Sequence, residues 1–366
     1  MTEDWENGGF GIYIHWPFCT AKCPYCDFNS HVRSNINQKQ WLKAYLNEIK
    51  RVSEKTSNRI LNSVFFGGGT PSLIEPSIIG DVLNEIQKHW KTKNNFEVTL
   101  EANPGSVDAK NFKAYKEAGV NRTSMGIQSL NTKDLKALGR THTVEEALAA
   151  FEIARQNFKA VSFDLIYARQ NQNINQWEKE LSLALSLEAS HMSLYQLTIE
   201  QGTAFGDRYN RGLLKGLPND DTSADMYDLT LSLCEDRGLV SYEVSNYAHQ
   251  GYESIHNLIY WRYGDYIGIG PGAHGRLTID GKKYATETVL SPEAWLKKVE
   301  CDGSGESNSV VLTDQQQAAE FVMMGLRLKL SLIHISEPTR PERISYGGVW
   351  LKKKRGGGGG GGGGGG

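Results

Sequence analysis

The 366-residue sequence has little cysteine, almost no net charge and no long apolar run. Its formal net charge of -2 argues against a nucleic-acid-binding surface and against strong attraction to an anionic membrane. No apolar stretch approaches the roughly 20 residues that cross a bilayer, and no signal-peptide pattern opens the chain. We therefore expect a soluble cytoplasmic protein without nucleic acid as a partner, long enough to bury one large or two medium cores.

The five cysteines are too few and too unevenly placed to form a disulfide framework. Cys19, Cys23 and Cys26 fall close together near the N-terminus, whereas Cys234 and Cys301 stand alone. An odd count with one tight cluster in a long chain indicates metal binding in a reducing compartment. Cys234 lies in a helical pattern and is expected to be a small buried side chain.

The segment 330–366 differs in composition from the rest of the chain. It begins with LSLIHISEPTR, which resembles a translated sequencing adapter, continues through ISYGGVWLKKK, which resembles a second adapter, and ends in eleven glycines. No packed domain uses such a glycine run, because glycine loses the most backbone freedom on folding. We interpret the segment as a read-through artefact, which implies that the native C-terminus is missing; a natural flexible tail is the alternative.

Short apolar runs alternate with longer helical patterns from residue 11 to residue 200. Strands separated by helices of this length predict βα units and a parallel sheet. Six repeats of one unit favour an α/β fold with a partial (β/α)6 barrel, which we place in residues 1–220. The apolar runs are GIYIHW, SVFFGGG, FEVTLEAN, RTSMGIQSL, AVSFDLIYA and HMSLYQLTI.

The pattern changes beyond residue 220. A helical segment comes first, followed by a segment rich in tyrosine and glycine at 242–276 and by a second helical segment at 314–328. We expect residues 221–329 to form a region specific to the protein's family and the start of a truncated C-terminal helical domain.

Polar and glycine residues follow the ends of the predicted strands. GGGTP (67–71) follows the second run, and Glu101, Gln128 and Asp164 follow the third, fourth and fifth runs. In barrels of parallel strands the chemistry lies at the carboxyl ends of the strands. These residues and the cysteine loop after the first run are therefore expected to share one site.

The cysteine loop has the spacing C-x3-C-x2-C, with Tyr25 directly before the last cysteine. Thiolates are the iron ligands of iron–sulfur clusters, and three thiolates on four irons leave one iron with an open position. A tetrahedral zinc site is the alternative, with His15 or His31 as a further ligand. We expect the three thiols to hold a [4Fe–4S] cluster.

This spacing resembles the radical S-adenosylmethionine (SAM) superfamily. The resemblance implies that SAM binds the open iron and is cleaved to a 5′-deoxyadenosyl radical, a chemistry that the cofactor supplies. The resemblance also implies SAM-binding roles for several residues. The alternatives are that the glycines form a plain turn and that the charged residues are helix caps or surface charges. The candidates are Gly68, Gly69 and Thr70 for the amino group, Glu101 and Asp164 for the ribose hydroxyls or the amino group, Gln128 for the ribose, Arg140 for the carboxylate, and Tyr13 and Tyr25 for the adenosyl or sulfonium group.

Longer motifs narrow the resemblance: IYIHWPFCTAKCPYCDFNS, FFGGGTPS, LEANPGS, NRTSMGIQSL, FDLIYA and YEVSNYA. From about residue 10 to residue 328 the chain resembles the family of oxygen-independent coproporphyrinogen III oxidase and of the heme chaperone HemW. The coproporphyrinogen dehydrogenases continue the cysteine motif to a fourth cysteine, where this chain has Phe28. That difference, and HNLIYW at 256–261, resemble the HemW branch.

The resemblance to HemW implies heme as cargo. His256 is the candidate heme ligand, because imidazole is a common axial ligand, and Tyr260 and Trp261 would line a porphyrin face. The alternative is that His256 is a loop histidine whose ring is hydrogen-bonded to the backbone and binds no heme. His274, in GIGPGAHG (268–275), is a second candidate, and that segment is expected to be a tight turn beside the site.

Two functions follow from the resemblance. A heme chaperone would carry a cluster and SAM, receive electrons from a donor, and pass heme to recipient hemoproteins, at the membrane or elsewhere. The alternative is an enzyme of porphyrin biosynthesis that decarboxylates coproporphyrinogen III; the complete SAM-binding set favours it and Phe28 argues against it. A structural iron–sulfur or zinc protein would leave Arg140 and Gln128 without a role.

Overall fold

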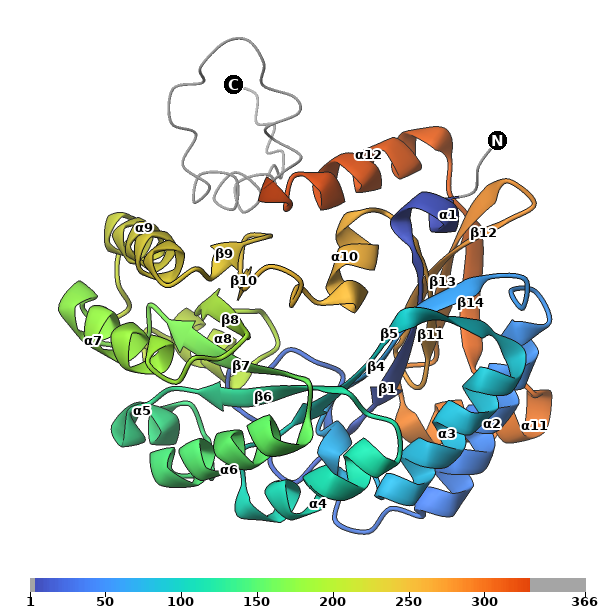
Figure 1. Ribbon diagram of the computed structural model, residues 1–366, viewed down its shortest axis with the longest axis horizontal. Helices are drawn as coiled ribbons and strands as arrows, with labels where there is room; N and C mark the ends of the chain where they lie inside the picture. The colour runs from blue at the N-terminus through green and yellow to red at the C-terminus, as the bar shows by residue number, and fades with distance from the viewer. Residues whose placement is uncertain (1–3, 330–366) are drawn as a thin grey trace, which may run out of the picture.

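The computed structural model describes residues 4–329, apart from the side chains of residues 106–108. The segment 330–366, interpreted as an artefact, lies outside the described residues. A curved sheet forms the centre of the fold, with helices along its outer side (Figure 1). Its central strands are β1 (Phe10–Trp16), β4 (Ile60–Gly68), β5 (Lys91–Ala102), β6 (Arg122–Gln128), β7 (Ala160–Tyr167) and β8 (His191–Gln196). The helices that connect them are α2 (Gln38–Ser53), α3 (Pro76–His89), α4 (Ser106–Glu117), α5 (Thr132–Ala137), α6 (Val144–Asn157) and α7 (Ile174–Leu185), with the 3-10 turn η1 (Pro71–Leu73) after β4.

The central strands pair side by side in the order β1-β4-β5-β6-β7-β8, and every neighbouring pair is parallel. Each connection passes through at least one helix, as parallel pairing requires. The structure therefore confirms the predicted α/β fold with a partial (β/α)6 barrel. The sheet does not close on itself, because further strands extend both of its edges.

Side chains at the helix N-termini explain where several of these helices begin. Asn37 Oδ1 accepts a hydrogen bond from the backbone N–H of Gln40 at the start of α2. Thr143 at the start of α6 forms a reciprocal capping box with Glu146. Such caps satisfy backbone donors that the helix itself leaves without partners. They place each helix start directly after a loop on one rim of the barrel.

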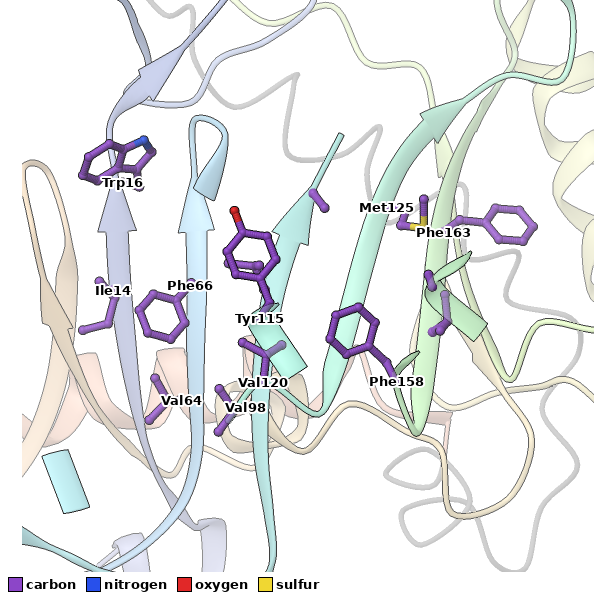
Figure 2. Packing of buried hydrophobic residues seen from close by; sticks show 14 of the residues in the cluster. Ile14, Trp16, Val64, Phe66, Val98, Tyr115, Val120, Met125, Phe158 and Phe163 are labelled. Atoms are coloured by element: carbon purple, nitrogen blue, oxygen red, sulfur yellow. The ribbon is translucent and has the colours of Figure 1, made fainter. Parts of the chain in front are cut away.

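Alternate residues of each strand face the helices, and this set is apolar. Ile14 of β1 lies opposite Phe66 of β4, and Val64 of β4 lies opposite Val98 of β5. Figure 2 shows these side chains together with Tyr115, which α4 contributes. The residues are almost completely buried, so they form the main core between sheet and helices.

The other set of strand residues faces the inside of the curved sheet and is largely polar. It includes Ser63, Glu101, Ser124 and Asp164, each one residue away from a helix-facing apolar side chain. Because successive strand residues point to opposite faces, the apolar core and the polar interior arise from the same pattern. The interior is therefore available for binding chemistry rather than for packing.

Residues 221–329 add strands to both edges of the sheet, where the sequence pattern predicts mainly helices. The elements outside the barrel are α1 (Asp4–Gly8), α8 (Ala204–Asn210), α9 (Asp220–Asp236), β9 (Val240–Ser241), β10 (Asn246–Ala248), α10 (Ile255–Trp261), β11 (Asp265–Ile269), β12 (His274–Ile279), β13 (Lys282–Thr288), α11 (Pro292–Asp302), β14 (Glu306–Val311) and α12 (Asp314–Gly325). β9 and β10 are short, β11 and β12 contain glycine, and β13 and β14 are rich in polar residues, so the strands have little local signal. These strands continue the pairing of the barrel strands, so one sheet contains residues from both sides of residue 220. The domain boundary at residue 220 stays a prediction.

The described residues, 4–329, include no helix with the length and apolar character needed to cross a membrane.

A buried ionic cluster fastens the added strands to the barrel. Asp265, at the start of β11, is fully buried and accepts hydrogen bonds from Arg59 Nη1 at 2.5 Å and Lys283 Nζ at 2.8 Å. Arg59 precedes β4 and also donates to the carbonyl of Thr278 on β12. One carboxylate therefore neutralises two buried cations from different parts of the sheet.

We predict that Asp265→Asn lowers the free energy of unfolding by about 3–5 kcal/mol, because buried Arg59 loses its carboxylate partner and buried Lys283 keeps only the partly exposed Asp4, at 3.0 Å. Glu293→Gln is the control: Glu293 pairs with Arg33 at 2.9 Å, but both side chains are more than half exposed. Its loss should cost less than about 1 kcal/mol. Equal effects in anaerobic denaturant titrations would contradict the assigned role of Asp265.

Candidate functional site

The loop between β1 and α2 carries three cysteines to the carboxyl end of the barrel strands. Cys19 ends the short strand β2 (Phe18–Cys19), which pairs in parallel with β3 (His31–Val32). The backbone N–H of Cys26 donates to the carbonyl of Cys23 at 3.2 Å, which turns the loop. All three cysteines line one cavity of about 1210 Å³.

Each of the three sulfur atoms has a polar neighbour. Hydrogen bonds to sulfur help set the reduction potential of an iron–sulfur cluster. Burial raises the pKa of the first and the third thiol, so a metal is needed to hold them as thiolates at neutral pH. The neighbours are Thr70 Oγ1 at 3.4 Å from Cys19 Sγ, Arg140 Nη1 at 3.4 Å from Cys23 Sγ, and Ser30 Oγ at 3.9 Å from Cys26 Sγ.

The histidines beside the cysteine loop are engaged elsewhere. His15 Nδ1 pairs with the Tyr13 hydroxyl at 3.0 Å and His15 Nε2 with the carbonyl of Asn29 at 2.9 Å. His31 Nε2 pairs with Asn29 Oδ1 at 3.1 Å. Among residues 4–329 no three His, Cys, Asp or Glu side chains converge on a position suited to a single metal ion. The arrangement does not favour the zinc alternative.

The glycine loop after β4 approaches the cysteine loop so closely that side chains would not fit. A Cβ on Gly68 would lie 2.6 Å from His15 Cε1, and a Cβ on Gly69 would lie 2.6 Å from the carbonyl oxygen of Phe18. Gly68 also has a φ of 115°, in the region that favours glycine. Gly68, Gly69 and Thr70 all line the cavity, as predicted from the sequence.

Two largely buried but cavity-lining acids, Glu101 and Asp164, face the cavity from β5 and β7. Burial raises the pKa of Glu101 to about 8, and the charge of Asp164 adds to the shift. Burial raises the pKa of Asp164 to about 6, while hydrogen bonds from Ser193 and Ser124 oppose the shift. Glu101 accepts the backbone N–H of Gly68 at 3.1 Å. A cationic ligand would stabilise both carboxylates.

Arg140 lies opposite these acids, in the loop after α5. Its Nη2 donates to Asn103 Oδ1 at 2.7 Å and to the carbonyl of Gly126 at 2.8 Å. Its Nε is buried without a hydrogen-bond partner. Gln128 lines the same cavity at the end of β6 with a φ of 72°, a conformation that costs energy for a residue with a side chain. Both features indicate a site built for a ligand.

Most of the predicted site residues come together in this cavity, whereas Tyr13, His256, Tyr260 and His274 do not line it. Tyr13 instead lines a second, smaller cavity that shares Gly68 and Glu101 with the first. His256 lines neither cavity. Those in the first cavity are Cys19, Cys23, Tyr25, Cys26, Gly68, Gly69, Thr70, Glu101, Gln128, Arg140 and Asp164.

His256 belongs to α10, which packs against the inner face of β1 and β4. Its Nδ1 pairs with Ser63 Oγ at 2.8 Å and its Nε2 with the Tyr260 hydroxyl at 2.8 Å. Its ring stacks on Phe65, and burial lowers its pKa to about 3. The side chain is only 1% exposed. A heme iron would have to displace Ser63 or Tyr260, so the position does not favour the sequence-based assignment of His256 as its ligand.

Several cavity residues have no assigned role in the sequence-based prediction. Asn103, directly after β5, orients Arg140, and Ser124, within β6, donates to Asp164 at 3.4 Å. Only Asn103 follows the strand-end rule that identified Glu101. Arg327 lines the cavity from outside the barrel, beside Trp261, which the sequence-based prediction assigns to a porphyrin face. No local motif marks Arg327, which stacks on the Trp261 ring at 4.4 Å and pairs with Glu243 at 2.7 Å.

These side chains fit a cluster with SAM beside it. Three thiols with polar neighbours suit three iron ligands, and the unpartnered Arg140 Nε can donate to a carboxylate. The carboxylates of Glu101 and Asp164 complement an amino group, ribose hydroxyls or a sulfonium charge. Tyr25 adds an aromatic ring to the wall.

We predict that Glu101→Gln stabilises the SAM-free protein at high pH. A folded-state pKa of about 8 lies above the usual 4.5, so the wild type loses stability as pH rises between these values. The variant lacks this loss, which is at most about 1.4 kcal/mol per pH unit. Thermal unfolding from pH 5 to pH 9 should therefore show a widening advantage for Glu101→Gln. Glu117→Gln, at an exposed carboxylate, is the control and should follow the wild type; parallel curves for all three proteins would refute the prediction.

Known proteins match both the sequence and the fold. Residues 13–184 match the family model of the radical SAM superfamily. The heme chaperone HemW of Haemophilus influenzae is 43% identical over 273 residues, which cover 73% of this chain and 70% of that protein. HemW of Escherichia coli is 36% identical, with 92% and 86% covered. The mitochondrial radical S-adenosyl methionine domain-containing protein 1 of Danio rerio is 38% identical, with 88% and 74% covered.

A solved structure has the same fold at low sequence identity. Coproporphyrinogen III oxidase (HemN) from Escherichia coli, a radical SAM enzyme, superposes with a TM-score of 0.74 at 20% identity. The match covers 87% of this chain and 75% of that one. The sequence matches show that the chain belongs to the radical SAM superfamily and, within it, to the family of the heme chaperone HemW.

Proposed function

We propose that this chain holds a [4Fe–4S] cluster through Cys19, Cys23 and Cys26, with SAM beside it. The observation that carries the proposal is one cavity with three thiols, an unpartnered Arg140 Nε and two acids with raised pKa values. When bound, the cluster supplies an open iron position and an electron for SAM. The protein's part is to orient SAM, with Arg140 on its carboxylate and the acids on its positively charged and hydroxyl groups.

The proposed function is that of a cytoplasmic heme chaperone, which binds heme and delivers it to recipient hemoproteins with the help of an electron donor. Two bacterial relatives at 36% and 43% identity carry the name heme chaperone. Phe28 supports the same proposal. It is 58% exposed and lines both cavities, so it gives the region near the cluster an apolar surface.

The alternative is oxidative decarboxylation of coproporphyrinogen III. In its favour, the cavity of about 1210 Å³ is larger than a drug-sized ligand requires. Against it, the coproporphyrinogen dehydrogenases that the chain resembles have a cysteine at the position of Phe28. Misplacement of a reacting group by about 1 Å can cost roughly 100-fold in rate, so this exchange close to the cluster argues against turnover.

We predict that changing Cys19, Cys23 or Cys26 to Ala abolishes the cluster, because each thiol is a separate iron ligand. Anaerobically reconstituted wild-type protein should contain about four irons and show a cluster signal that SAM alters. Cys301→Ala is the matched control, because that cysteine is exposed and outside the cavity. A colourless zinc protein from anaerobic expression would refute the cluster.

A second prediction separates the chaperone from the enzyme. With SAM, a reductant and coproporphyrinogen III under anaerobic conditions, we expect no protoporphyrinogen IX by chromatography, together with stoichiometric heme binding in a parallel titration. Sustained decarboxylation would overturn the chaperone proposal. Absence of both activities would refute both functions and leave only the cluster and SAM site.

A further inference from the structure

A second cavity of about 330 Å³ opens beside the first and uses none of the cysteines. The two cavities share Phe28, Gly68 and Glu101, so they are separated by little more than the glycine loop. The walls of the second cavity are aromatic, with Tyr260 and Tyr266 in edge-to-face contact at 4.5 Å between ring centroids. This volume is at the small end of ligand sites, so the cavity suits one edge of a large flat ligand.

The rim of this cavity carries His274, at the start of β12. Its side chain is 58% exposed, and its Nδ1 lies 3.8 Å from Glu287 Oε1. Within residues 4–329, its Nε2 makes no hydrogen bond, in contrast to both ring nitrogens of His256. Iron coordination needs an accessible imidazole nitrogen, and His274 offers one where the buried histidine does not.

Glu287 suits His274 for metal binding. The two residues are cross-strand partners on β12 and β13, so the sheet holds the carboxylate beside Nδ1. Histidines that ligate metals usually present their other nitrogen to a carboxylate or carbonyl, which fixes the ring and strengthens the ligand. This arrangement leaves Nε2 as the nitrogen for iron.

Exposed apolar side chains lie around the same rim. Phe28 is 58% exposed and Leu290 is 65% exposed. The Leu290 side chain reaches Gly272, where a Cβ would lie 3.1 Å from it, and Gly272 is part of the cavity wall. The turn around Gly270 and Gly272 has φ angles of 111° and 71°, so it is the tight turn expected for GIGPGAHG. Apolar surface of this kind is stabilised when a porphyrin face covers it.

We propose that heme binds at the second cavity, with His274 Nε2 as the axial iron ligand and with Phe28 and Leu290 against the porphyrin. The inference rests on the proposed chaperone function and adds to it the place of the cargo and its ligand. The cavity takes up one edge of the macrocycle and leaves the rest on the surface. A carrier must release its cargo, and a partly exposed heme is accessible to a recipient.

The test is a heme titration of the anaerobically reconstituted full chain, followed by the Soret band and by the ligand-field spectrum of the iron. We expect His274→Ala to weaken heme binding at least about tenfold and to remove the imidazole-ligand spectrum. Added free imidazole should restore that spectrum, and the iron–sulfur absorption should not change. His249→Ala is the matched control, because His249 is partly exposed and lines neither cavity.

The outcomes separate the inference from the proposed function. If the wild-type protein binds no heme, the chaperone function fails and the heme site with it. If heme binds but His274→Ala behaves as His249→Ala does, the assignment of His274 is wrong and the chaperone function stands. If His256→Ala loses the imidazole-ligand spectrum and His274→Ala keeps it, the axial ligand is His256 on α10 and the assignment of His274 is wrong. Weaker binding in Phe28→Ala with an unchanged iron spectrum would support the apolar contact.

Discussion

The two-residue period of the parallel strands is the constraint on which both the core and the site depend. Residues of one parity, such as Val64 and Leu100, are buried against the helices, whereas residues of the other parity, such as Glu101 and Asp164, face inward. A parallel sheet covered on both faces usually has apolar residues on both. Here the inner face stays polar because it surrounds cavities. A register shift of one residue would bury the acids against the helices and remove the site.

The first cavity contains groups that are unfavourable without a ligand. Glu101 and Asp164 are largely desolvated acids with raised pKa values, and Arg140 has a buried N–H without a partner. Desolvated polar groups of this kind cost stability unless they are paired. A ligand with a carboxylate and positively charged groups would satisfy them together. The fold supplies the stability elsewhere, in the apolar core and in the ionic cluster around Asp265.

The sequence predicts the barrel and most of the first cavity because both have local signals. Alternating strands and helices mark the units, and strand-end residues such as Glu101 and Gln128 mark the site, whereas Asp164, predicted at a strand end, lies within β7. The pairing of β11 with β1 joins residues about 250 positions apart, and no local pattern encodes it. His256 is a different case: its motif is visible, but only the structure shows that Ser63 and Tyr260 already occupy both ring nitrogens. Arg327 has no signal at all, since its role depends on α12 lying across the barrel (Figure 1).

Gly68 lies in the wall between the two cavities and donates its N–H to Glu101, which also borders both. A ligand in one cavity that favours the ionised form of Glu101 changes the charge and the hydrogen bonding at the edge of the other. Such an effect is thermodynamically reciprocal: whatever factor a ligand of the first cavity imposes on the affinity of the second cavity, an occupant of the second cavity imposes on the affinity of the first. If SAM and heme bind as proposed, one backbone amide and one carboxyl group would couple their two binding equilibria.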